Sequence, residues 1–206
     1  MDKNPEQNFE KIKPFLEKNN INSILYERPF IKAEFLEKII QNSNVPIHYL
    51  DFDLMYSGFL SGEIIPKRGN VFLHTPNHGE LRDILKVIAA KISQQKSIVI
   101  IDSLNGFYNL YDEKDSGRLI NSYTMLLGLV AQSTDSMILL ASMAKIKDKE
   151  SWVLVPTGRR IIASNFLTSI TLKHDDSAIL VNLLDRKNAV TDSIRILRDS
   201  TSDQLF

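Results

Sequence analysis

Two aspartates that each follow a hydrophobic run are the side chains best placed for chemistry in this sequence. Asp102 follows Ile98–Ile101 and precedes Ser103, and Asp53 closely follows the run Ile47–Leu50. In open parallel sheets, ligands bind at the carboxyl ends of the strands, so carboxylates at those ends face the ligand crevice. Such oxygens can hold Mg²⁺ or activate a water molecule. The pattern therefore predicts an acidic site at one edge of a sheet.

The hydrophobic pattern also predicts the elements that position these acids. Short aliphatic runs alternate with segments of helical spacing until about Lys145, which is typical of a parallel sheet covered by helices. Short strands then follow one another across tight polar turns, which indicates antiparallel hairpins. We predict an α/β fold, a three-layer αβα sandwich with a mostly parallel sheet and C-terminal antiparallel hairpins. The predicted strands are Ser23–Tyr26, Ile47–Leu50, Val71–His74, Ile98–Ile101, Met137–Leu140, Trp152–Val155, Phe166–Leu172, Ala178–Leu184 and Ser193–Leu197.

The connecting segments are expected to be helices or loops. Helices are predicted from about Lys32, after a capping box formed by Asn77 and Glu80, and around Tyr123–Val130. Residues 27–31 and 106–117 are expected to be loops. The segment that contains Gly58, Gly62, Pro66 and Gly69 is expected to be irregular.

The chain divides into an N-terminal helical arm, residues 1–20, and a core domain, residues 21–206. The arm is polar with a sparse apolar stripe formed by Phe9, Ile12, Phe15 and Leu16. Such a stripe either packs on the main domain or mediates oligomerisation.

Composition excludes several classes of protein. Lys plus Arg and Asp plus Glu both number 25, so the zero net charge gives no global attraction to nucleic acid or anionic membranes. The 206 residues include no cysteine, which excludes disulfides and cysteine-ligated metal and is typical of a reducing cytoplasm. No apolar run approaches the ~20 residues of a membrane span, and the N-terminus is too polar for a signal peptide. We expect a cytoplasmic protein without membrane contact.

The order of these segments resembles the core domain of the RecA/RadA/KaiC family of ATPases, especially short archaeal RadA paralogues. The strand before Asp53 is similar to the family strand that ends in a catalytic acid, and the strand that ends in Asp102-Ser103 is similar to the Walker B strand. Thr157-Gly158-Arg159-Arg160 is similar to a glycine motif after the second DNA-binding loop. The resemblance covers nearly the whole chain after residue 20 and implies a RecA-like sheet.

The chain departs from this family at the phosphate-binding loop. The family pattern Gly-x-x-x-x-Gly-Lys-Ser/Thr aligns with Glu27–Glu34, where Glu27 and Lys32 take the glycine positions and Ala33 takes the lysine position. Glycines let the backbone N–H groups of this loop wrap around phosphate, whereas side chains at those positions block close approach. We therefore expect no binding and hydrolysis of ATP in the family manner.

The remaining acids and cations would then form a vestigial nucleotide site of Lys32, Asp53, Asp102 and Ser103, without a catalytic residue and without a required cofactor. A one-residue slip would let Lys32 replace the missing lysine and bind ATP and Mg²⁺ weakly. For Asp53 and Asp102, we favour solvated or salt-bridged residues, paired with Lys32 or Arg28, over a magnesium pair.

Two further groups of residues could bind ligands. Lys145, Lys147, Arg159 and Arg160 flank the region where the family binds DNA, and they predict a weak nucleic-acid patch or a solvated loop. Phe107, Tyr108 and Tyr111 could stack on bases or pack against a partner subunit. We expect no metal site at His74 and His78, because a strand end and Pro76 separate them and no carboxylate completes the ligand set.

The resemblance implies a non-catalytic RecA-like protein, a pseudo-ATPase that acts as a scaffold or accessory subunit in DNA recombination or repair. It would form a homo-oligomer, or a hetero-oligomer with an active RecA-like paralogue. Two alternatives remain open. One is a weak or atypical ATP-binding NTPase. The other is a relative of the ParA/MinD group, whose Asp-x-Asp-Leu motif resembles Asp51-Phe52-Asp53-Leu54.

Overall fold

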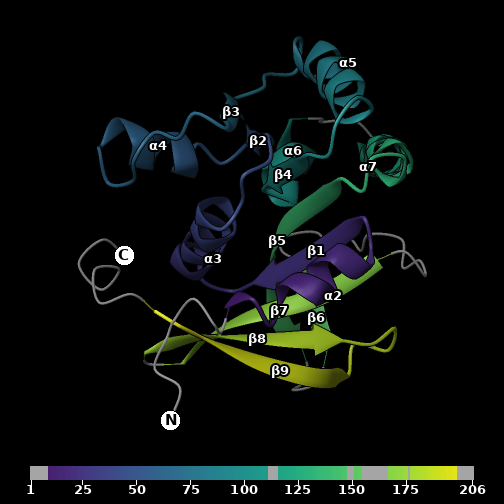
Figure 1. Ribbon diagram of the computed structural model, residues 1–206. Helices are drawn as coiled ribbons and strands as arrows, with labels where there is room; N and C mark the ends of the chain where they lie inside the picture. Colours follow the sequence, from purple (N-terminus) through teal and green to yellow (C-terminus); the bar gives the residue numbers. More distant parts are fainter. Residues whose placement is uncertain (1–8, 111–115, 148–150, 155–166, 176, 199–206) are drawn as a thin grey trace.

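The computed structural model describes residues 9–110, 116–147, 151–154, 167–175 and 177–198. A single sheet with the strand order β3-β2-β4-β5-β1-β7-β8-β9 runs through the molecule, and helices flank it (Figure 1). Strands β3 to β7 along this order are parallel, and β8 and β9 extend the sheet as antiparallel strands. The predicted α/β sandwich with C-terminal antiparallel hairpins is confirmed.

The parallel part of the sheet alternates strands with helices along the chain. Its elements are β1 (Ile21–Tyr26), α3 (Pro29–Gln41), β2 (Ile47–Asp51), α4 (Met55–Ser61), β3 (Val71–His74), α5 (Leu81–Ile92), β4 (Ile98–Asp102), α6 (Leu104–Asn109), α7 (Ser116–Gln132) and β5 (Met137–Lys147). The antiparallel part comprises β6 (Ser151–Leu154), which pairs with β5, then β7 (Leu167–Asp175), β8 (Ala178–Leu184) and β9 (Val190–Leu197). Strand β5 is longer than its aliphatic run predicts because it continues into the pairing with β6.

Each face of the sheet carries its own hydrophobic core. One core lies under α3 and α4 and includes Ile24, Phe35 and Tyr49. The other lies under α5, α6 and α7 and includes Leu50, Val99 and Ile101. The central strands β2 and β4 are buried throughout, as expected for parallel strands covered on both faces.

Three helices include residues that the sequence placed in loops or in an irregular connection. Helix α3 starts at Pro29, because proline at the first helical position lacks only an N–H that would have no partner there. Helix α6 starts at Leu104, where the Ser103 side chain accepts a hydrogen bond from the Gly106 amide. Helix α4 includes Gly58, although glycine is less favourable than most residues inside a helix.

The N-terminal arm packs on the domain. Its helix α2 (Lys13–Lys18) has proline in the first turn, and Phe9, Ile12 and Leu16 are buried in the core under α3. In the described residues, no helix has the length and apolar character to cross a membrane.

Candidate functional site

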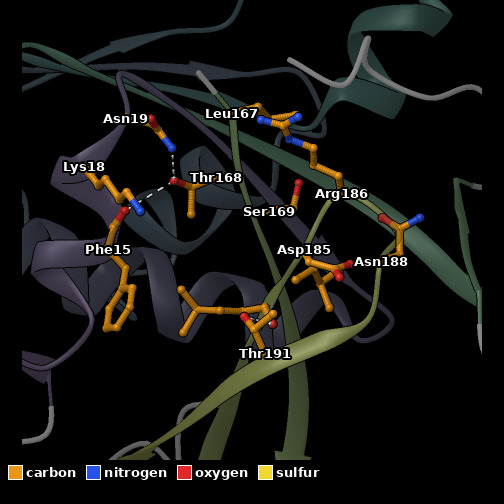
Figure 2. A pocket seen from close by; sticks show the side chains of 12 residues that line it. Phe15, Lys18, Asn19, Leu167, Thr168, Ser169, Asp185, Arg186, Asn188 and Thr191 are labelled. Atoms are coloured by element: carbon orange, nitrogen blue, oxygen red, sulfur yellow. Dashed lines mark hydrogen bonds between the residues drawn. The ribbon is translucent and has the colours of Figure 1, made fainter. Parts of the chain in front are cut away.

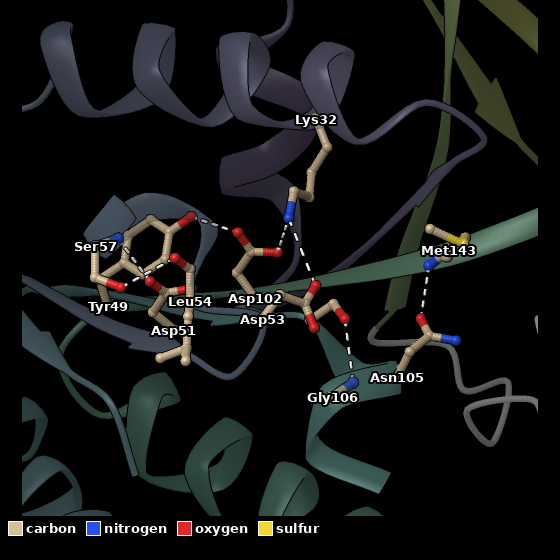
Figure 3. Close-up of polar contacts among 11 residues, drawn as sticks. Lys32, Tyr49, Asp51, Asp53, Leu54, Ser57, Asp102, Asn105, Gly106 and Met143 are labelled. Atoms are coloured by element: carbon tan, nitrogen blue, oxygen red, sulfur yellow. Dashed lines mark hydrogen bonds and ion pairs between the residues drawn. The ribbon is translucent and has the colours of Figure 1, made fainter. Parts of the chain in front are cut away.

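The carboxyl ends of β2 and β4 bring the sequence-predicted acids together. Asp51 pairs with Asp102 in the register of the two parallel strands, and Asp53 follows two residues later. Figure 3 shows these side chains gathered below the N-terminal part of α3, with Lys32 directed toward them. Asp102 is buried, whereas the Asp53 side chain is 31% exposed at the rim.

Lys32 is the centre of this cluster. Its Nζ atom lies 2.5 Å from Oδ1 of Asp102 and 3.8 Å from Oδ2 of Asp53, and it stands 5.2 Å from the centroid of the Tyr26 ring. Both ion-pair partners Lys32 and Asp102 are 1% exposed. The ammonium of Lys32 is therefore surrounded by three groups of this chain. Two are carboxylates, and the third is the face of an aromatic ring.

Tyrosines complete the surroundings of Asp102. The Tyr49 hydroxyl donates a hydrogen bond of 2.6 Å to Oδ2 of Asp102, and the Tyr49 ring stacks on Tyr56 with centroids 4.2 Å apart. Burial raises the pKa of the Asp102 carboxyl, while Lys32 and Tyr49 oppose that shift. Burial also raises the pKa of Tyr49 well above its usual value, and the charge of Asp102 adds to this effect. Tyr49 therefore remains a neutral hydrogen-bond donor at physiological pH.

The polar groups next to Asp102 have structural partners. The Ser103 hydroxyl accepts the Gly106 N–H at 3.2 Å and so caps α6. Asp51 accepts the Ser57 N–H at 2.7 Å and orients α4. Asp53 lies against α6, where a Cβ atom added at Gly106 would stand 2.5 Å from its Oδ1. Each of these groups positions a helix at the carboxyl edge of the sheet.

The connection between β1 and α3 consists of Glu27 and Arg28 alone. A connection of two residues places the start of α3 directly at the strand end. Two residues further along the helix from Lys32, Glu34 is buried and binds Arg198, whose Nε lies 2.8 Å from Oε2 of Glu34. This contact ties α3 to the end of β9.

Little space remains beside Asp102. A cavity of about 10 Å³, lined in part by Ala33, Tyr49 and Asp102, has at most the volume of one water molecule. Larger cavities of about 350 and 540 Å³ lie at the amino ends of the strands. Figure 2 shows the first of these, between the arm and the turn that joins β8 to β9. Small-molecule pockets usually exceed about 300 Å³, so the cavity beside Asp102 is too small for such a ligand.

The structure brings the predicted residues Lys32, Asp53, Asp102 and Ser103 together. Of the predicted nucleic-acid patch, Lys145 is exposed on β5 and Lys147 ends that strand, while Arg159 and Arg160 lie outside the described residues. Tyr111 also lies outside them.

The aromatic residues near α6 do not all face outward. Phe107 is fully buried and stacks on Phe52 with centroids 4.7 Å apart, so it is unavailable for base stacking. The prediction for this residue was wrong, because α6 turns it into the core under α5 and α7. The ring of His74 stacks on that of His48, with centroids 5.9 Å apart. No metal-binding group of three or more His, Cys, Asp or Glu is found in the described part of the chain.

Sequence reasoning missed Tyr49 and Arg198. Tyr49 carried a signal, because a tyrosine inside a buried strand needs a partner for its hydroxyl. Arg198 carried none, since its partner Glu34 is 164 residues away.

The fold has a counterpart among solved structures. A crystal structure of the RadB recombinase aligns with a TM-score of 0.55 at 11% sequence identity, over 86% of this chain and 86% of that chain. No protein-family model matches the sequence, and no curated protein matches it. The likeness in structure shows that this chain has a RecA-like α/β fold.

Proposed function

We propose that this RecA-like chain is a non-catalytic accessory or scaffold protein, a pseudo-ATPase that serves DNA recombination or repair by self-association or by pairing with an active RecA-like paralogue. One observation carries the proposal. The ammonium of Lys32 forms a buried ion pair with Asp102 at the edge where a nucleotide-binding sheet would hold phosphate and Mg²⁺. The RadB likeness supports the choice of process by analogy of fold.

The local geometry supports the loss of nucleotide binding. Glu27 and Arg28 are too short a connection to wrap around a triphosphate, and Pro29 contributes no N–H to an anion site. A magnesium ion at Asp102 would have to displace Lys32 from a buried ion pair that water does not screen. The Lys32 ammonium would then lose its buried carboxylate partner, and this loss opposes the binding of Mg²⁺ at Asp102.

Thermal unfolding with and without Mg-ATP tests this proposal. A ligand at about 100 times its Kd stabilises a protein by about 2.7 kcal/mol, which raises the Tm of a chain of this size by several degrees. We expect no change in Tm at millimolar Mg-ATP, and no retention of labelled ATP in equilibrium dialysis. An active RecA-like ATPase measured in parallel establishes that both assays detect binding. Saturable retention of ATP would refute the proposal.

A weak ATP-binding NTPase is the second candidate, and the 31% exposure of the Asp53 side chain beside Lys32 favours it. In this alternative, Lys32 leaves Asp102 to contact phosphate. Asp53 is partly exposed and could then bind Mg²⁺. Retention of ATP that requires Mg²⁺ and disappears in Lys32→Ala would identify this alternative. ATP hydrolysis would distinguish it from mere binding.

Binding of single-stranded DNA is a separate proposal. Support comes from the exposed Lys145 on β5 and from the cations at 159 and 160 in the sequence. Phosphate contacts weaken steeply with salt, so retention on single-stranded DNA is expected at low salt only. It should weaken on charge reversal at Arg159 and Arg160. Absence of retention at low salt would exclude this role.

A further inference from the structure

Helix α7 combines a buried face with an outer face that carries a single charge. Of its 17 residues, only Arg118 is charged. Ile120, Leu127 and Ala131 are buried against the sheet, whereas Leu126 and Leu129 are 53% and 62% exposed. A surface helix normally carries charged residues on its outer side. Figure 1 shows α7 at the periphery of the molecule, beside α5.

The neighbouring helix α5 provides the contrast. It contacts α7 and covers the same face of the sheet. Its outer side carries Arg82, Asp83, Lys86 and Lys91, all exposed. Two helices of the same layer therefore differ in the charge of their outer faces. The exposed leucines of α7 are typical of a surface that binds another protein.

The outer face of α7 has the spacing of a helix-pairing seam. Ser122, Leu126, Leu129 and Ser133 are separated by four, three and four residues, the alternation that keeps side chains facing one partner helix. The Ser122 hydroxyl donates to the Arg118 carbonyl and the Ser133 hydroxyl donates to the Val130 carbonyl. Covering these serines would therefore leave no hydroxyl donor unsatisfied.

This seam is symmetric about its own midpoint. In an antiparallel pair of α7 helices centred between Leu126 and Leu129, Leu126 of one copy meets Leu129 of the other, and Ser122 meets Ser133. A two-fold interface requires such self-complementarity, with residue i against j and j against i. The same arrangement places Arg118 of each copy near the C-terminal end of α7 in the other copy. Asp135 lies just beyond that end, and both side chains are exposed.

We propose that two copies of this chain associate through an antiparallel, two-fold pairing of α7 along the seam Ser122–Leu126–Leu129–Ser133. This deepens the proposed scaffold function by naming the surface, and it does not depend on the loss of nucleotide binding. A single helix pair buries less than the ~800 Å² per partner of standard stable complexes. We therefore expect a weak dimer, with a dissociation constant in the micromolar range.

Sedimentation velocity of the full chain, from about 10 μM to about 500 μM, measures this association. The weight-average mass should rise from 23.5 kDa toward twice that value. Leu126→Glu and Leu129→Glu should each abolish the rise, because they bury unpaired charges in both copies. Val190→Glu is the matched control, since Val190 is 55% exposed on β9, and it should dimerise normally. A chain that stays monomeric throughout, or a dimer that survives Leu129→Glu, would overturn the proposal.

Crosslinking tests the orientation, because the chain has no cysteine of its own. Leu126→Cys and Leu129→Cys proteins are mixed in equal amounts and oxidised with glutathione disulfide. Antiparallel pairing predicts mainly the mixed 126–129 disulfide, since only those positions face each other across the axis. Mainly 126–126 and 129–129 disulfides would indicate a parallel pair and refute the proposal. Dialysis of ATP against the same variants shows separately whether the nucleotide proposal fails.

Discussion

The Nζ atom of Lys32 lies 2.5 Å from Oδ1 of Asp102, and this buried pair joins the first turns of α3 to the end of β4. Tyr49 satisfies the other carboxylate oxygen. The pair therefore has its charges and its hydrogen bonds compensated within the chain. Such a pair holds two elements in place, and its effect on stability depends on both partners being present.

Removing one partner of this pair should destabilise the fold strongly. Lys32→Met leaves Asp102 buried without its cation, and we expect a loss of about 3–5 kcal/mol in the free energy of unfolding. Asp102→Asn leaves the buried ammonium with only the partly exposed Asp53, 3.8 Å from Nζ, as a counter-charge, so it should also lose stability. Urea unfolding followed by circular dichroism measures both losses.

The double variant Lys32→Met with Asp102→Asn provides the control for direct coupling. Because neither charge remains to be compensated, the double variant should lose clearly less stability than the sum of the single variants. Additive losses would show that the two residues act independently, contrary to the geometry.

Most strands could be predicted because buried parallel strands leave a local signal. Ile98–Ile101 is a continuous β-branched run, and Val71–His74 matches the structure residue for residue. The helix starts were less predictable. Pro29 and Gly106 are read as loop residues from sequence, yet proline fits the first helical position and Gly106 is required by the close approach of Phe52.

The candidate site was partly predictable for a similar reason. Strand ends mark Asp53 and Asp102 locally, and a basic residue after β1 suggested a partner. The Tyr49 contact depends on the register between β2 and β4, and the Arg198 contact depends on the placement of β9 near α3. No local pattern encodes either relation, because each joins residues far apart in the sequence.

A methyl group added at Gly106 should destabilise the protein, whereas one at Gly58 should not. The Cβ of Gly106→Ala would lie 2.8 Å from Cβ of Phe52 as well as close to Asp53. We expect this overpacking to cost about 1–3 kcal/mol. Gly58 has open space around its Cβ position in α4, so Gly58→Ala should stabilise by up to about 1 kcal/mol. Urea unfolding compares the two, and equal effects would contradict the close approach of α6 to Phe52.

Mild acid should weaken the fold through His48. Burial lowers the pKa of His48 to about 4, from a usual value near 6.5, and burial lowers that of His74 in the same direction. Between these values, the unfolded chain binds more protons than the folded chain, so stability falls as pH falls from 6.5 toward 4. After allowance for partial solvent screening, we expect His48 to account for about 1–2 kcal/mol of this loss.

The variant His48→Phe separates this effect from general acid unfolding. Neither ring nitrogen of His48 has a hydrogen-bond partner in the described residues, and the ring already stacks on Phe72. A phenylalanine should therefore be tolerated and should flatten the pH dependence of the unfolding free energy between pH 4 and 6.5. An unchanged slope would assign the acid sensitivity to other groups.

The contact between Glu34 and Arg198 should anchor the last strand to α3. Glu34 is 4% exposed and Arg198 is 10% exposed, so Arg198→Ala leaves a buried carboxylate without this cation. We expect a loss of about 2–3 kcal/mol in the free energy of unfolding. Arg195→Ala on β9 is the matched control, because its ion pair with Asp175 is solvent-exposed and should be worth less than about 1 kcal/mol. Adding Glu34→Gln to Arg198→Ala should restore part of the stability, since the amide needs no counter-charge. Equal losses for the two arginine variants, or no recovery with Glu34→Gln, would show that the ion pair between Glu34 and Arg198 does not hold β9 to α3.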